Sequence, residues 1–135
     1  MSDYSGNTIL VAEDYDDARE MLRTFLENLG YNVVEAANGK EAVEVAQKAK
    51  PDLILMDLNM PELDGVSAAA VIRNLAELSE VPILANSADG NRGIELFLSI
   101  KNFGRGYVGY LTKPLNLDTL AEQIETALLK VPKTA

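Results

Sequence analysis

Short runs of apolar residues recur along this chain, separated by segments in which apolar and polar positions follow a different period. Wholly or mostly apolar runs occupy 8–12, 53–56, 81–85 and 107–111, and a weaker run occupies 31–36. Runs of this length that stop at acids, amides or turn residues are typical of buried strands. The pattern therefore predicts five strands.

Between the runs at 8–12 and 31–36, apolar residues recur at intervals of three and four, which predicts an amphipathic helix. Its apolar positions are Ala18, Met21, Leu22, Phe25, Leu26 and Leu29. Asp16 or Asp17 suits the first turn of this helix, and Gly30 suits its C-terminal cap. Four more helices are predicted over 40–50, 67–78, 91–103 and 117–129.

Turn and cap residues set the predicted limits of these helices. Asn38-Gly39 and Asp64-Gly65 are turn dipeptides, Pro51 prevents the second helix from continuing, and Asn116 caps the last helix. The residues predicted to face inward in the second helix are Ala42, Val43, Ala46 and Ala49. Those predicted to form one stripe in the last helix are Leu120, Ala121, Ile124 and Leu128.

Apolar strands that alternate with helices indicate a parallel sheet covered on both faces. Five strands and five helices predict a doubly wound, flavodoxin-like α/β fold with strand order 2-1-3-4-5. With 135 residues, we expect a single domain over 1–135 with its core at about 8–129.

Composition narrows the chemistry. The chain has no cysteine and no histidine, which excludes disulfides, thiolate nucleophiles, the usual zinc sites and a histidine phosphocarrier. Its net charge of −9 disfavours nucleic acid and anionic membranes as partners. The sequence has neither a membrane-spanning run nor a secretory signal, so we expect a soluble, cytoplasmic protein.

Polar side chains follow four of the predicted strands. They are Glu13-Asp14, Asp57, Asn86-Ser87 and Thr112-Lys113. Because the carboxyl ends of parallel strands share one edge of the sheet, three carboxylates, a hydroxyl and an ammonium are expected to converge there. Clustered carboxylates need a compensating cation, and oxygen ligands of this kind suit Mg²⁺. Lys113 would neutralise part of the cluster and suit an incoming phosphoryl group.

The chain resembles the receiver domain of two-component response regulators. The resemblance covers Thr8 to Leu129, and its strongest piece is the segment 53–65, LILMDLNMPELDG, together with the upstream acidic pair and Lys113-Pro114. It implies a stand-alone receiver that accepts a phosphoryl group on Asp57 from a histidine kinase or phosphotransfer protein. Such a receiver catalyses only its own phosphorylation and dephosphorylation and is no turnover enzyme.

The resemblance also implies roles for individual residues. Asp14, Asp57 and the backbone carbonyl of Asn59 would bind Mg²⁺, with Glu13 binding the ion or one of its waters. Ser87 and Lys113 would contact phosphoryl oxygens, and Tyr110 would be an aromatic switch. The resemblance further implies a cis Lys113-Pro114 peptide bond.

The predicted fourth helix differs from the family pattern. The stretch 89–109 is longer than usual, and its apolar residues cannot all face one stripe, so Leu96 or Leu98 together with Tyr107 could form an exposed patch. We predict a downstream protein partner, or self-association, through helix 4, strand 5 and helix 5. The alternative is a helix that is covered by a long loop.

Other functions fit the residues less well. An aspartate-nucleophile phosphohydrolase needs a second aspartate where Asn59 stands, and a flavin module needs a phosphate-binding loop where Glu13-Asp14 would repel phosphate. A receiver-like adaptor that takes no phosphate usually lacks one of the acids or the lysine. Taken singly, each site residue could also be a helix cap, a turn former or a core residue.

Overall fold

Five parallel strands form one sheet in the structure, a computed structural model that describes residues 6–60, 64–87 and 108–129. The strands are β1 (Thr8–Ala12), β2 (Asn32–Ala36), β3 (Leu53–Asp57), β4 (Ile83–Ser87) and β5 (Val108–Thr112). Their order is β2-β1-β3-β4-β5, and each neighbouring pair is parallel. The predicted sheet and strand order are confirmed.

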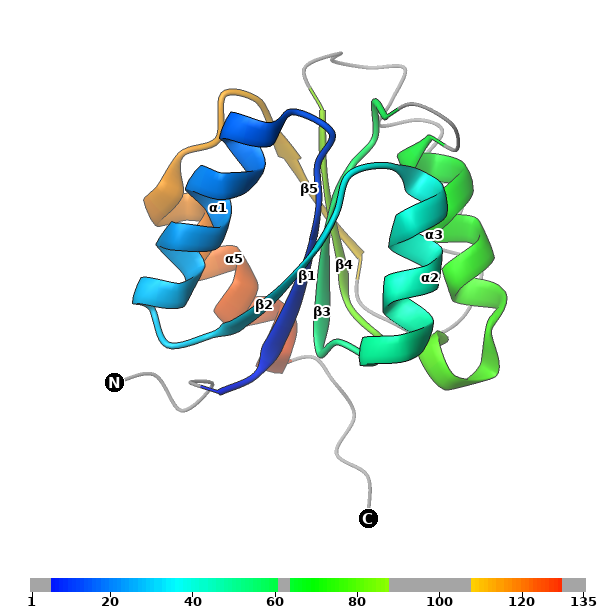
Figure 1. The fold of residues 1–135 in the computed structure, drawn as a ribbon. Helices are drawn as coiled ribbons and strands as arrows, with labels where there is room; N and C mark the ends of the chain where they lie inside the picture. The colour runs from blue at the N-terminus through cyan, green and yellow to red at the C-terminus, as the bar shows by residue number, and fades with distance from the viewer. Residues whose placement is uncertain (1–5, 61–63, 88–107, 130–135) are drawn as a thin grey trace.

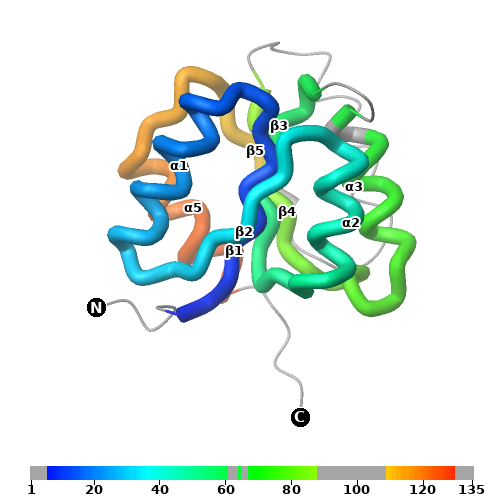
Figure 2. Tube along the Cα trace, in the orientation of Figure 1, coloured from blue at the N-terminus to red at the C-terminus, as the bar shows by residue number. Residues whose placement is uncertain are grey.

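Helices cover both faces of the sheet. Helices α1 (Asp16–Asn28) and α5 (Leu117–Leu129) lie on one face, and α2 (Gly39–Ala49) and α3 (Gly65–Asn74) lie on the other (Figure 1, Figure 2). The short 3₁₀ helix η1 (Ala76–Leu78) follows α3. The predicted helix 91–103 lies outside the described residues, as do Leu96, Leu98 and Tyr107.

The two-residue period of the strands divides the core into two clusters. Ile9 and Val11 of β1 belong to the cluster under α1 and α5, whereas Leu10 and Ala12 belong to the cluster under α2 and α3. Every residue of β3 is buried, as expected for a central strand of a doubly covered sheet. These strands are therefore apolar because both of their faces are buried, each under a layer of helices.

Several predicted limits were wrong. Asn38 does not form a turn but caps α2, since its side chain accepts a hydrogen bond from the Glu41 amide at 2.8 Å and Gly39 is already helical. Asp64 likewise caps α3 by accepting from the Ser67 amide. The predicted helix 67–78 instead begins at Gly65 and is interrupted at Leu75, whose backbone is extended.

Three side chains expected on buried faces are exposed. Met21 of α1 and Leu29, which follows this helix, keep 46% and 39% of their surface exposed, and Ala49 is exposed at the end of α2. By contrast, Asn116 caps α5 as predicted, since its side chain accepts from the Thr119 amide at 3.0 Å. Of the predicted α5 stripe, Leu120, Ile124 and Leu128 are buried and Ala121 is half-buried.

In the described part of the chain, none of the helices combines the length and the apolar character that crossing a bilayer requires.

Candidate functional site

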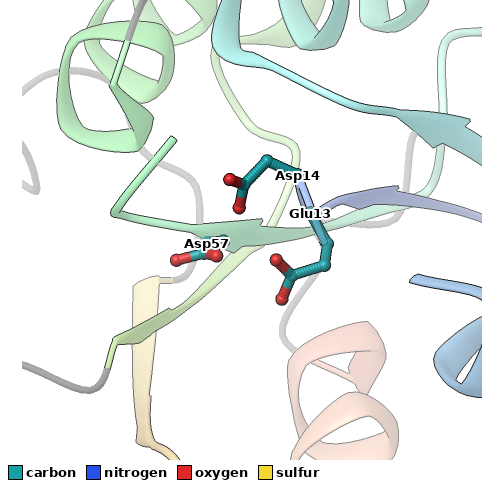
Figure 3. A group of neighbouring side chains, drawn as sticks. All are labelled: Glu13, Asp14 and Asp57. Carbon is teal, nitrogen blue, oxygen red and sulfur yellow. The ribbon is translucent and has the colours of Figure 1, made fainter. Parts of the chain in front are cut away.

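The carboxyl ends of the central strands bring the predicted carboxylates together. Ala12 at the end of β1 lies opposite Met56 of β3, so Glu13 emerges beside Asp57, the last residue of β3. Glu13, Asp14 and Asp57 each contribute one carboxylate oxygen to a cluster in which these oxygens lie within 4.8 Å of one another (Figure 3). Glu13 and Asp57 are almost fully buried, whereas Asp14 is exposed.

Lys113 completes this cluster from the end of β5. Its ammonium lies 3.0 Å from Oδ2 of Asp57 and 3.1 Å from Oε1 of Glu13. Burial lowers the pKa of Lys113, but hydrogen bonds to the two carboxylates and their negative charges more than offset this, so its pKa is raised. The lysine is therefore held in its charged form. The Lys113-Pro114 peptide bond is cis, as predicted.

Backbone groups orient the buried acids. The amide of Asn59 donates to Oδ1 of Asp57 at 2.9 Å, and the amide of Tyr15 donates to Oε2 of Glu13 at 3.2 Å. Together with Lys113, these donors engage both oxygens of each buried carboxylate. The acids are thus held in fixed orientations.

Ser87 lies inside β4 rather than beyond its end, which corrects the predicted strand limits of 81–85. The pairing of β4 with β5 runs through Ser87 and Thr112 and so extends the strand. The hydroxyl of Ser87 accepts a hydrogen bond from the side-chain amide of Asn59 at 3.0 Å. The sequence assigned only the backbone carbonyl of Asn59 to the site, so this side-chain contact was missed.

Tyr110 lies in β5 opposite Ala85, and its ring packs against the core cluster under α2 and α3. Its hydroxyl is buried and has no hydrogen-bond partner among the described residues. Asn86, which lies opposite Asp57, is also buried, and its Oδ1 has no partner in the same described ranges. The sequence assigned no role to Asn86.

The donor set fits a hard divalent cation. Three carboxylates and one lysine carry a formal charge of −3 + 1 = −2, which a single divalent ion neutralises. Mg²⁺ takes oxygen ligands at about 2.0–2.1 Å, so oxygens on opposite sides of the ion are about 4.2 Å apart. Oxygens within 4.8 Å of one another approach this spacing, and one carboxylate can also bind through a water.

Comparisons with known proteins point to one family. The family model for the response regulator receiver domain matches residues 9–125. The chain is 29% identical over 121 residues to the polar-differentiation response regulator DivK of Brucella anthropi, covering 90% of this chain and 95% of DivK. It is 34% identical over 132 residues to the probable transcriptional regulator ycf27 of Porphyridium aerugineum, covering 94% of this chain but only half of ycf27.

Among solved structures, the chain is similar to the receiver domain of the sensor histidine kinase PA1611 from Pseudomonas aeruginosa. The TM-score is 0.83 with 33% identity, and the match covers 93% of this chain and 99% of that one. That structure is described with a magnesium ion coordinated in the active-site cleft.

Proposed function

Because the chain belongs to the family of response regulator receiver domains, we propose that it accepts a phosphoryl group on Asp57. The donor is the phosphohistidine of a histidine kinase or of a phosphotransfer protein, and the reaction depends on Mg²⁺. We propose that this reaction takes place in the cytoplasm. The observation that carries this proposal is the buried carboxylate of Asp57, held between Lys113 and the Asn59 amide at the edge of the acidic cluster.

The proposed reaction is a displacement at phosphorus. An oxygen of Asp57 forms a bond to phosphorus while the bond from phosphorus to the histidine nitrogen breaks, and the electron pair leaves with the imidazole. Lys113 would pair with a phosphoryl oxygen as negative charge develops, and its contact with Asp57 supports this role. The phosphoryl group stays on Asp57 until the acyl phosphate is hydrolysed, so the reactions that the chain catalyses are its own phosphorylation and dephosphorylation.

The residues that would hold Mg²⁺ are Asp14, Asp57 and the backbone carbonyl of Asn59, with Glu13 binding the ion or one of its waters. When bound, the ion supplies positive charge that offsets the repulsion between the carboxylates and the phosphoryl group. The exposed position of Asp14 supports an entry path from solvent.

We propose that Ser87 and Tyr110 respond to the phosphoryl group. The Ser87 hydroxyl would leave the side-chain amide of Asn59 and donate a hydrogen bond to a phosphoryl oxygen. The Tyr110 hydroxyl has no partner among the described residues, so reorienting its ring would cost no hydrogen bond there. The altered surface would lie around 91–103, β5 and α5 and bind a downstream protein partner or a second copy. Of these segments, the described part of the chain includes only β5 and α5.

A phosphodonor assay tests the proposal. We expect acetyl phosphate with Mg²⁺ to add one alkali-labile phosphoryl group, detected by intact mass, and we expect a chelator to prevent the addition. Asp57→Asn should abolish it, since a carboxamide is no nucleophile at phosphorus. Asp118→Asn, at an exposed aspartate of α5, is the matched control and should be phosphorylated normally. Phosphorylation of Asp57→Asn, or none of the wild type, would overturn the assignment.

A further inference from the structure

Two of the three clustered carboxylates stand on the loop that joins β1 to α1. Glu13 and Asp14 are consecutive, so the orientation of the peptide unit between them affects the directions in which both side chains leave the backbone. Like charges this close repel each other, and an unsupported loop would relax by moving them apart. The loop therefore needs an anchor that acts on its backbone.

Arg19 provides such an anchor from the first turns of α1. Its Nη1 donates to the backbone carbonyl of Glu13 at 2.9 Å. Its Nη2 pairs with Asp16 at 2.6 Å, and its Nε lies 3.6 Å from Oε1 of Glu35 on β2. Only 18% of the Arg19 side chain is exposed. One planar guanidinium thus joins the loop, the start of α1 and the edge strand β2.

The carbonyl that Arg19 holds belongs to the peptide unit between Glu13 and Asp14. Because a peptide unit is planar, fixing its carbonyl also fixes the plane from which Asp14 continues. The guanidinium is suited to this task, since its five donors form a rigid fork that can hold several acceptors at once. Among the described residues, the hydrogen bonds from the Glu13 amide to the Ala36 carbonyl, from the Tyr15 amide to the Glu13 side chain and from the Arg19 amide to the Tyr15 carbonyl leave the Glu13 carbonyl to the Arg19 guanidinium.

We infer that Arg19 is a positioning residue for the divalent-cation site, which it supports through the Glu13 carbonyl without touching the cation or the phosphoryl group. This inference rests on the proposed function, because it takes Mg²⁺ as the ligand of the acidic cluster. Partners of ligands in metal sites commonly change metal affinity by 10–100-fold when they are removed.

The sign of the effect separates positioning from simple charge. Arg19 is a cation near an acidic site, so removing its charge alone would strengthen Mg²⁺ binding by lowering the repulsion between the two cations. Removing an anchor would instead weaken binding, because the carboxylates could separate. The two explanations therefore predict opposite changes in affinity.

Arg23 supplies a matched control. It lies one helical turn after Arg19 and pairs with the same Glu35, at 3.2 Å, and with Glu27, at 3.4 Å. Its side chain is 49% exposed, and its partners, Glu27 and Glu35, both lie outside the β1–α1 loop. Arg23→Gln thus removes the same charge from the same helix and leaves the Glu13 carbonyl held.

The experiment is calorimetric titration of the full chain with MgCl₂. We expect Arg19→Gln to weaken Mg²⁺ binding about tenfold, Arg19→Lys to weaken it less, and Arg23→Gln to leave it unchanged or slightly tighter. In the phosphodonor assay, Arg19→Gln should raise the Mg²⁺ concentration needed for half-maximal rate and leave the rate at saturating Mg²⁺ close to that of the wild type.

The possible outcomes are distinguishable. Wild type that binds no Mg²⁺ would overturn the proposed function itself. If the wild type binds Mg²⁺ and Arg19→Gln binds it equally or more tightly, only the role of Arg19 is overturned. Urea unfolding checks that each variant is folded. Should Arg19→Gln fail to fold, the test uses Arg19→Lys, and a Mg²⁺ affinity of Arg19→Lys equal to that of the wild type would refute the role of Arg19.

Discussion

Replacing Lys113 with methionine tests how the acidic cluster is balanced when no divalent cation is bound. Lys113 pairs with two carboxylates whose side chains are only 2% and 4% exposed, whereas its own side chain is 30% exposed. Methionine has a similar length and no charge. The change therefore removes the ammonium and leaves Asp57 and Glu13 buried without this counter-charge.

The magnitude follows from the distances. At about 3 Å and an effective dielectric constant of about 20, each ion pair is worth roughly 5 kcal/mol before desolvation is counted. Two carboxylate oxygens within 4.8 Å repel each other by roughly 3 kcal/mol or more at the same dielectric constant. Breaking a buried pair typically costs 3–5 kcal/mol, and solvent screening of the partly exposed lysine reduces this. We expect Lys113→Met to lower the free energy of unfolding by about 2–3 kcal/mol in chelator.

Urea unfolding followed by circular dichroism measures this difference. In chelator, Lys113→Met should be less stable than the wild type, and Lys48→Met, at an exposed lysine of α2, should be unchanged. Adding Mg²⁺ should stabilise Lys113→Met more than the wild type, because the ion then compensates the carboxylates alone. Equal stability of wild type and Lys113→Met in chelator would refute this account of the cluster.

The difference in free energy of unfolding between wild type and Lys113→Met should decrease at high pH. The pKa of Lys113 is raised above 10.5 in the folded chain, so its contribution is complete below pH 10.5 and is lost as the pH rises through the folded-state pKa. The stability gap between wild type and Lys113→Met should be constant from neutral pH to about 10 and narrow above 10.5. Arg73, whose pKa burial lowers to about 10, is present in both proteins and cancels in the difference.

Two further substitutions test local energetics by urea unfolding. Tyr110→Phe should leave the free energy of unfolding unchanged or raise it by up to about 1 kcal/mol, since the buried hydroxyl has no partner among the described residues; a loss of more than about 1 kcal/mol would show that the hydroxyl is bonded in solution. Asn38→Ala should lower it by about 1 kcal/mol, because the Glu41 amide loses its cap, whereas Asn38→Asp should retain most of the stability.

The parts of the fold that the sequence predicted are those decided by periodicity. All-apolar strands leave few arrangements other than a doubly covered parallel sheet, and the sheet in turn brings Asp57 beside Glu13 through the register of β1 and β3. Limits decided by tertiary contacts were not predictable. The break at Leu75 is one such limit: the Arg73 side chain reaches beyond its helix to the carbonyls of Leu78 and Val81. No spacing of apolar residues signals a contact of that kind.

The contacts of Arg19 and of the Asn59 side chain were not predicted, for the same reason. In the sequence, Arg19 is one basic residue on the polar face of an amphipathic helix, and only the conformation of the β1–α1 loop directs the Glu13 carbonyl toward it. The contact from Asn59 to Ser87 likewise depends on β4 continuing to Ser87 instead of ending at 85. The convergence of Glu13, Asp57 and Lys113 was predictable because strand ends in a parallel sheet share one edge whatever the loops do.

The hydrogen bonds at the end of β4 explain how an event at Asp57 could reach β5. The backbone carbonyl of Ser87 accepts a hydrogen bond from the backbone amide of Lys113 at 3.1 Å. The Ser87 hydroxyl accepts one from the side-chain amide of Asn59, and the backbone amide of Asn59 donates to Asp57. A phosphoryl group on Asp57 would add negative charge between Lys113 and Ser87 and would accept a hydrogen bond from the Ser87 hydroxyl, which draws Ser87 toward Asp57. Because Ser87 is tied through its backbone to the residue that follows β5, a shift of Ser87 would displace the end of the strand that carries Tyr110. On the proposed function, coupling between phosphorylation and the β5 surface thus requires no element beyond the strand ends that form the site.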